Sequence, residues 1–252
     1  MLLSQKNVHP RDERIQFIEE THKYIVDGSS DGIISVTTLI HEHFPKFDAT
    51  KVLKMMRNKH EKYPGLSDEQ IKESWEKNGK QASGQGTKMH KMIENYYNDI
   101  KNDEKDCELI EYKYFLSFDS EVRQKKGFVP YRTEWSIFDG DLDLAGQLDM
   151  LYKKDDGTYA LYDWKRVKEI KTDNSYEKGL GKLKHLPHCN YYHYSLQLNV
   201  YKRILEKRYD MKITEMILVV LHPDNDNYKL HEVFEMNMEI DYIFGHRHDE
   251  IN

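Results

Sequence analysis

Apolar and polar positions alternate in two parts of the chain, and the first is near the N-terminus. Residues 15–18 and 23–26 flank a turn, and the Asp- and Gly-rich stretch 27–32 leads into a third apolar run, 33–36. Short apolar runs separated by turn residues are typical of β-strands. The pattern therefore predicts a hairpin region over residues 15–40.

The second alternating part begins near residue 131. Three apolar runs, 131–138, 142–153 and 158–166, are separated by Asp-Gly turns. Asp-Gly dipeptides favour tight hairpin turns, so these runs predict a three-stranded antiparallel meander. Two further strands are expected at 213–221 and 230–236.

Five segments carry the 3.6-residue periodicity of amphipathic helices: 48–60, 67–79, 88–100, 106–126 and 191–209. Asp48 and Ser67 are expected N-caps, and Gln70 lies three residues after Ser67, as in a capping box. The Gly84-Gln85-Gly86-Thr87 sequence is expected to break the chain before the third of these helices. Residues 167–190 have no clear period and are rich in Lys and His.

This order of elements predicts an α/β fold in which a central mixed sheet is flanked by helices. A length of 252 residues suits a single domain, 1–252. Within it, residues 1–126 would supply the hairpin and a helical wall, and residues 127–236 the catalytic sheet core.

Composition excludes several classes of protein. The formal net charge of −6 argues against a general polyanion binder, although carboxylates that bind metal also make a site acidic. Cys107 and Cys189 cannot supply the four thiolates of an iron–sulfur cluster, and we expect free thiols. No apolar run approaches the roughly 20 residues that cross a bilayer. We therefore expect no membrane contact and an intracellular protein, in the cytoplasm or nucleus.

The candidate chemistry lies in the meander. Asp163 and Lys165 are two residues apart on one expected strand, so they face the same side, and counting back from the turn places Asp149 beside them. Carboxylates bind Mg²⁺ or Mn²⁺, and an ammonium stabilises charge that develops on a phosphate. The alternative for such a group is a cross-strand salt bridge worth roughly 0–1 kcal/mol.

The spacing Gly-x-x-Asp (Gly146 to Asp149), about a dozen residues, then Asp-x-Lys (Asp163 to Lys165), resembles the signature of the PD-(D/E)XK nuclease superfamily. Three further segments resemble its RecB-like branch, which includes stand-alone viral and phage exonucleases. They are Gly86-Thr87-Lys88-Met89-His90, Gln197-Leu198-Asn199-Val200-Tyr201 and Ile34-Ser35-Val36-Thr37-Thr38. The chain departs from branch members that hold an iron–sulfur cluster, because it has two cysteines.

The resemblance implies a restriction-endonuclease-like core and roles for individual residues. Asp149, Asp163, His90 and the Trp164 backbone carbonyl would bind Mg²⁺ or Mn²⁺, and Lys165 would be the catalytic lysine. Glu134 is expected near Asp149 as a further acid, and Glu94 as a hydrogen-bond partner of His90. The resemblance also implies that Gln197 and Tyr201 contact DNA and support the site. Independently of the resemblance, Arg166, Lys168 and Lys182 are expected to contact DNA, because their Lys-rich stretch is interleaved with aromatic residues and suits phosphate pairing and base stacking.

The resemblance favours an exodeoxyribonuclease that acts on DNA ends or single strands in replication, recombination or repair. A structure-specific endonuclease of the same fold, or a non-catalytic DNA-binding subunit, remain alternatives. The sequence is compatible with an oligomer, and a viral or phage protein would work in the host cytoplasm.

Overall fold

The computed structural model describes residues 1–56 and 59–252. Its centre is a mixed sheet built from β3 (Ile34–Ser35), β4 (Val129–Asp139), β5 (Leu144–Lys153), β6 (Tyr159–Lys165), β7 (Ile213–Val220) and β8 (Lys229–Glu232). The strands β4, β5 and β6 form the expected antiparallel meander. β7 is parallel to β6, and β8 is antiparallel to β7. The short strand β3 adds in parallel to the beginning of β5.

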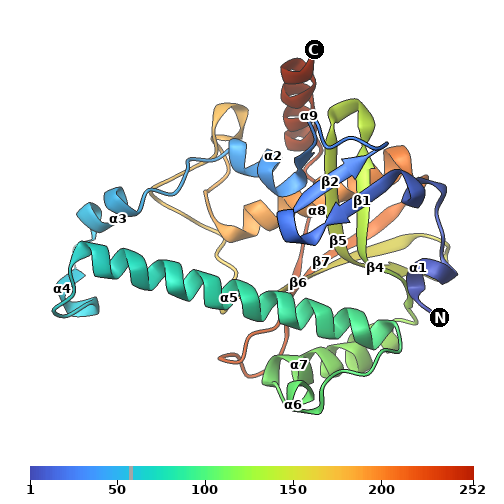
Figure 1. The fold of residues 1–252 in the computed structure, drawn as a ribbon, viewed down its shortest axis with the longest axis horizontal. Helices are drawn as coiled ribbons and strands as arrows, with labels where there is room; N and C mark the ends of the chain where they lie inside the picture. The colour runs from blue at the N-terminus through green and yellow to red at the C-terminus, as the bar shows by residue number, and fades with distance from the viewer. Residues whose placement is uncertain (57–58) are drawn as a thin grey trace.

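Helices cover both faces of this sheet (Figure 1). One face packs against α2 (Val36–Glu42), α8 (Asn190–Arg208) and α9 (Asn237–Ile251). The other face packs against the second half of α5 (Asp68–Tyr97) and against α7 (Ile110–Phe118). The expected fold class, a central mixed sheet flanked by helices with an N-terminal helical wall, is confirmed.

The connection from β6 to β7 explains the parallel pair. Antiparallel strands join by tight turns, whereas parallel neighbours need a crossover, usually a helix. Here α8 is that helix, and its apolar side, which includes Leu198, Tyr201 and Leu205, is buried against the sheet.

The N-terminal segment packs along β4, from Tyr131 to Phe138. It begins with α1 (Leu3–Lys6) and forms the hairpin β1 (Ile15–Ile18) and β2 (Lys23–Val26). The predicted third strand of this region is shorter than expected, because Ser35 caps α2 through its hydroxyl and the chain turns helical at Val36.

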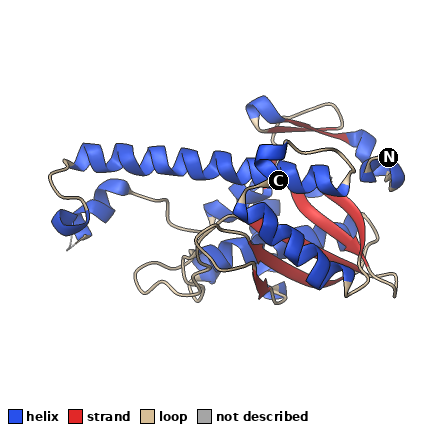
Figure 2. Ribbon diagram, turned by 90° about the horizontal axis from the view of Figure 1, so that it is seen from below, coloured by secondary structure: helices blue, strands red, loops and turns tan. Residues whose placement is uncertain are grey.

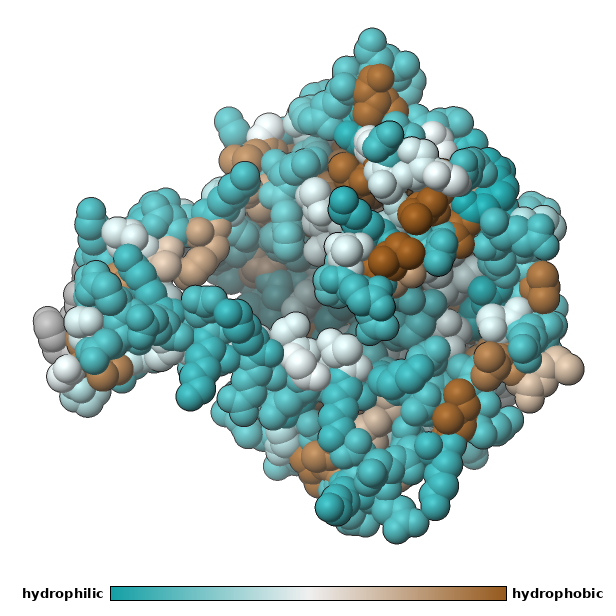
Figure 3. Space-filling model, viewed as in Figure 1, coloured by the Kyte–Doolittle hydropathy of each residue, from teal (hydrophilic) through white to brown (hydrophobic). Residues whose placement is uncertain are grey.

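A helical arm projects from the body of the molecule (Figure 2). It consists of α3 (Ala49–Met55), α4 (Lys59–Lys62) and the first half of α5. Asp48 caps α3, and Ser67 and Gln70 form the expected capping box of α5. The predicted helix 48–60 is confirmed only over α3, because Met56 has an extended backbone and ends that helix; positions 57 and 58 lie outside the described residues. A hollow separates the arm from the body (Figure 3).

The predicted break at Gly84-Gln85-Gly86-Thr87 is wrong. α5 is one helix of 30 residues, about 45 Å long. Glycine in a helix interior is less favourable than alanine by about 1 kcal/mol, but it does not end a helix whose two ends are held by packing and caps. Thr87 does not cap; its hydroxyl donates back to the carbonyl of Ser83.

Three other features differ from the sequence predictions. The predicted helix 106–126 is divided into α6 (Glu104–Cys107), α7 and the π-helical turn η3 (Asp119–Gln124). The predicted strand 230–236 ends at Glu232. The helix α9 was not predicted. Within the described ranges, none of the helices has the length and apolar character needed to span a bilayer.

Candidate active site

Asp149 and Asp163 lie side by side on neighbouring strands. Met150 of β5 is opposite Tyr162 of β6, so the residues one step further from the turn, Asp149 and Asp163, are adjacent. Both are buried, at 8% and 1% exposure. The Trp164 amide donates to Oδ2 of Asp149 at 2.8 Å, which fixes that carboxylate against β6. The sequence count from the turn thus predicted this juxtaposition correctly.

Lys165 completes the group on β6. Its Nζ lies 2.7 Å from Oδ2 of Asp163 and 4.5 Å from the centre of the Tyr194 ring of α8. Burial opposes the charge on Lys165, but Asp163 and Asp149 outweigh it and raise the pKa of the ammonium. Lys165 is therefore a fixed cation at neutral pH, suited to stabilising negative charge.

His90 approaches from α5, where its neighbours Met89 and Ile93 are buried against the sheet. Its Nε2 donates to the carbonyl oxygen of Trp164 at 3.0 Å, and its Nδ1 lies 3.3 Å from Oε1 of Glu134. Nδ1 is also 3.7 Å from Oδ1 of Asp149. Burial lowers the pKa of His90, yet the two carboxylates more than offset it and raise the pKa to about 9.

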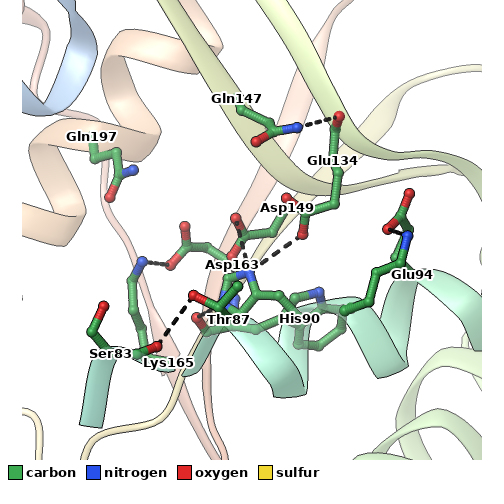
Figure 4. Close-up of polar contacts among 12 residues, drawn as sticks. Ser83, Thr87, His90, Glu94, Glu134, Gln147, Asp149, Asp163, Lys165 and Gln197 are labelled. Carbon is green, nitrogen blue, oxygen red and sulfur yellow. Dashed lines mark hydrogen bonds and ion pairs between the residues drawn. The ribbon is translucent and has the colours of Figure 1, made fainter. Parts of the chain in front are cut away.

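Glu134 reaches this group from β4 through an irregular backbone. Its φ is +43°, in the left-handed region that costs of order 1–3 kcal/mol for a residue other than glycine. Its carbonyl oxygen accepts a hydrogen bond of 2.9 Å from Nε2 of Gln147 on β5. Figure 4 shows the Glu134 carboxylate directed toward His90 and Asp149.

The donor set fits a hard divalent cation with one imidazole ligand. Ligand atoms of His90, Glu134 and Asp149 lie within 4.8 Å of one another. Both Asp163 carboxylate oxygens are buried without a hydrogen-bond donor among the described residues, apart from the ion pair to Lys165. Burial and the neighbouring Asp149 raise the pKa of Asp163 to about 7, and burial raises that of Asp149. A cation would stabilise both carboxylates in the ionised form.

Two residues that were expected near the site lie in different surroundings. Glu94 pairs with Lys91 on its own helix at 2.8 Å and points away from His90 (Figure 4). Tyr201 is 2% exposed, and its hydroxyl accepts a hydrogen bond of 3.1 Å from Gln197. The Tyr201 ring packs on Gly146, so Tyr201 supports the strand that carries Asp149.

The basic residues after β6 already have partners. Arg166 forms an ion pair of 2.8 Å with Glu111, and both side chains are at least nine-tenths buried. Lys168 pairs at 3.0 Å with Asp224 in solvent. Lys182 lies over the Tyr242 ring, 5.5 Å from its centre. None of the three is in contact with the acidic group.

Two residues of the site, Gln147 and Tyr194, were not predicted from the sequence. Gln147 lies within the segment Gly146 to Asp149, and Tyr194 lies in the predicted helix 191–209. A glutamine two residues before a candidate metal ligand, as Gln147 is before Asp149, does not by itself indicate a role in the site. The contact between Tyr194 and Lys165 depends on how α8 crosses the sheet, which the sequence pattern does not specify.

Comparison with known proteins gives the family. The family model described as "PD-(D/E)XK nuclease superfamily" matches residues 39–241. No curated protein matched the chain. Among solved structures, one titled "Crystal structure of SSO0001" is similar, with 15% identity, a TM-score of 0.36, and coverage of 89% of this chain and 78% of that chain. The family match covers most of the chain, including every residue of the site described above, and the chain therefore belongs to the PD-(D/E)XK nuclease superfamily, a group of metal-dependent nucleases.

Proposed function

We propose that this protein is a deoxyribonuclease of the RecB-like branch, of the stand-alone viral or phage type, and that it removes nucleotides from DNA ends or single strands. It would act as a single domain over residues 1–252. The observation that carries the proposal is the arrangement of acids where β5, β6 and α5 meet. Asp149 lies beside Asp163 on neighbouring strands, Lys165 pairs with Asp163, and His90 lies 3.7 Å from Asp149.

The proposed cation ligands are Asp149, Asp163, His90 and the Trp164 carbonyl oxygen, with Glu134 as a further acid. Mg²⁺ and Mn²⁺ both accept oxygen ligands, and the imidazole of His90 favours Mn²⁺. When bound, such a cation polarises the phosphate and lowers the pKa of a coordinated water.

Lys165 has a distinct role in this scheme. Hydrolysis places additional negative charge on the phosphoryl oxygens as water attacks phosphorus. The Lys165 ammonium is fixed by Asp163 and by the Tyr194 ring, so it is oriented before the phosphate arrives. A preorganised cation of this kind stabilises the transition state without rearrangement.

His90 and Glu134 offset each other's charge beside Asp149. The His90 Nε2 donates to the Trp164 carbonyl, Nδ1 lies beside the Glu134 carboxylate, and the neighbouring carboxylates raise the pKa of His90 to about 9, which favours the protonated imidazole at neutral pH. A metal ligand must be neutral imidazole, so cation binding would release the His90 proton.

DNA contacts are proposed for Gln197, Lys168, Lys182 and Arg166. Gln197 is half-buried near Lys165 (Figure 4). The hollow beside the arm adjoins the segment that carries Asn174, Tyr176 and Glu177. A protein segment rich in basic and aromatic residues suits the binding of single-stranded DNA, because basic side chains pair with phosphates and aromatic rings stack on bases.

The test is cleavage of end-labelled linear, nicked and closed circular DNA with Mn²⁺ or Mg²⁺. The exonuclease proposal predicts degradation of linear DNA and persistence of the closed circle. Cleavage of the circle would support the endonuclease alternative. Absence of cleavage of every substrate, with either cation, would contradict the proposal and favour a non-catalytic subunit.

A further inference from the structure

The left-handed conformation of Glu134 is unusual for its place in the fold. Six described residues other than glycine have positive φ: His22, Asp27, Asp99, Glu134, Asp143 and Asp210. Five of these follow or precede a helix or strand, where chain reversals require such a conformation. Glu134 lies inside β4, five residues from either end. Glutamate, unlike aspartate or asparagine, is not a residue type that favours this region.

The conformation breaks the alternation of β4. In a regular strand, consecutive side chains point to opposite faces of the sheet. Here Thr133 and Glu134 both face α5, because Asn98 donates to the Thr133 hydroxyl at 3.1 Å and His90 lies beside Glu134. Arg132 and Trp135, three residues apart, both contact Asp12 on the other side. In a regular strand the Glu134 carboxylate would point away from His90, and the irregular backbone directs it toward His90.

Gln147 makes the contact that accompanies this irregularity. The ladder between β4 and β5 pairs Thr133 with Met150 and Trp135 with Leu148, and it omits Glu134. The Glu134 carbonyl oxygen instead accepts the hydrogen bond of 2.9 Å from the Gln147 side chain. The Gln147 amide therefore takes the place of a strand partner at Glu134, which has none in the ladder.

We infer that Gln147 is a positioning residue that holds Glu134 in its left-handed conformation and so places the Glu134 carboxylate in the cation site. This inference rests on the proposed function, because it assigns Gln147 a role in building that site. The side-chain amide of Gln147 bonds to the Glu134 backbone and acts on the site through it. Outer partners of metal ligands orient them, and their loss reduces metal affinity by about 10- to 100-fold.

The test is direct binding of Mn²⁺ to the full chain without DNA, followed by electron paramagnetic resonance of the free ion. Gln147→Met keeps the side-chain length and removes the donor. It is expected to raise the Kd for Mn²⁺ about tenfold, while the melting temperature in EDTA changes little. Gln124→Met is the matched control, because Gln124 donates a hydrogen bond of 3.1 Å to Asp119 and lies outside the proposed cation site. This variant should leave the Kd for Mn²⁺ unchanged.

A double-mutant cycle separates positioning from a general effect on folding. Glu134→Gln removes the carboxylate that Gln147 is inferred to position. In the Glu134→Gln background, Gln147→Met should cause no further loss of Mn²⁺ affinity. Equal losses in both backgrounds would overturn the inference, as would an unchanged Kd for Gln147→Met beside a raised Kd for Glu134→Gln. If Gln147→Met does not fold, Gln147→Asn, whose amide is one methylene too short, takes its place with the same expectation.

Failure of the inference and failure of the proposed function give different results. Asp163→Asn must weaken Mn²⁺ binding if the site is where we propose it. Loss of binding in Asp163→Asn with no effect of Gln147→Met would contradict the role of Gln147 alone. Wild-type binding in Asp163→Asn would contradict the proposed function itself.

Discussion

Oδ2 of Asp163 lies 2.7 Å from Nζ of Lys165, two residues further along the same strand. The pair faces Tyr194 of α8, and Asp149 lies beside it on β5. A surface ion pair at this spacing would add little stability. Here both side chains are largely buried and the Asp149 carboxylate lies beside them, so the positions of the Asp163 and Lys165 charges are held in place.

The Lys165 ammonium is expected to matter for cleavage and not for cation binding. Lys165→Met should lower kcat about 10²- to 10³-fold, because a preorganised charge is lost at the attacked phosphate. Mn²⁺ affinity should stay the same or increase, since a cation is removed beside Asp163. Lys101→Met, an exposed lysine paired with Glu104, is the control and should keep wild-type kcat. Equal activity of the two variants would exclude a catalytic role for Lys165.

The pKa shifts predict how the stability of the metal-free protein changes with pH. His90 is raised from 6.5 to about 9, so its contribution is full below pH 6.5 and is lost as the pH rises through 9. Asp163 is raised from 3.8 to about 7, so the folded state also loses stability as the pH rises from 4 to 7.

In EDTA, the free energy of unfolding should therefore fall as the pH is raised toward 9, and Mg²⁺ should oppose the fall by binding the ionised groups. Urea unfolding at a series of pH values, with EDTA or with Mg²⁺, measures this. His90→Gln should flatten the upper part of the EDTA profile. A metal-free profile that rises over the same range would contradict the assigned shifts.

Two glycines are expected to respond in opposite directions to substitution by alanine. A Cβ at Gly146 would lie 2.6 Å from Cε1 of Tyr201 and 2.9 Å from Cγ2 of Val36, so Gly146→Ala should destabilise the protein by about 1–3 kcal/mol. A Cβ at Gly84 would meet nothing within 4 Å, and α5 is helical there, so Gly84→Ala should stabilise by about 1 kcal/mol. Thermal unfolding of both variants checks the signs, and a stabilised Gly146→Ala would contradict the packing of α8 on β5.

Arg166 and Lys168, both proposed to contact DNA, should differ in their effect on folding. Arg166→Ala leaves Glu111 buried without its partner, which should cost about 3–5 kcal/mol of stability. Lys168 pairs with Asp224 in solvent, so Lys168→Ala should leave the free energy of unfolding nearly unchanged. The same variant should reduce the slope of log affinity for DNA against log salt concentration by about 1. Unfolding curves and binding at several salt concentrations distinguish the two. Unaltered stability of Arg166→Ala would show that the ion pair is not structural.

The sequence predicted the core of the site because its residues are close in the chain. Asp149, Asp163 and Lys165 are carried by adjacent strands of one meander, and counting from the Asp-Gly turn brings them together. His90 is more distant, and only the resemblance to a known branch indicated it. The structure places it against the Trp164 carbonyl through the packing of α5, a tertiary contact that no local pattern encodes.

Other element boundaries were not predicted because tertiary packing or helix capping overrode the local sequence preference. Gly84 and Gly86 favour a break, but packing of Ile71 at one end of α5 and of Met92 and Ile93 at the other keeps one helix. The strand run at 33–36 was interrupted because Ser35 caps a helix. The left-handed Glu134 and its contact with Gln147 left no mark in the sequence, since neither residue type is associated with that conformation.

The most direct test of the central claim is a crystal of this protein soaked in Mn²⁺, with diffraction measured at the manganese absorption edge. An anomalous peak is expected between Asp149 and Asp163, in contact with the Trp164 carbonyl and His90. A peak elsewhere, or the two carboxylates directed apart with no ion between them, would contradict it.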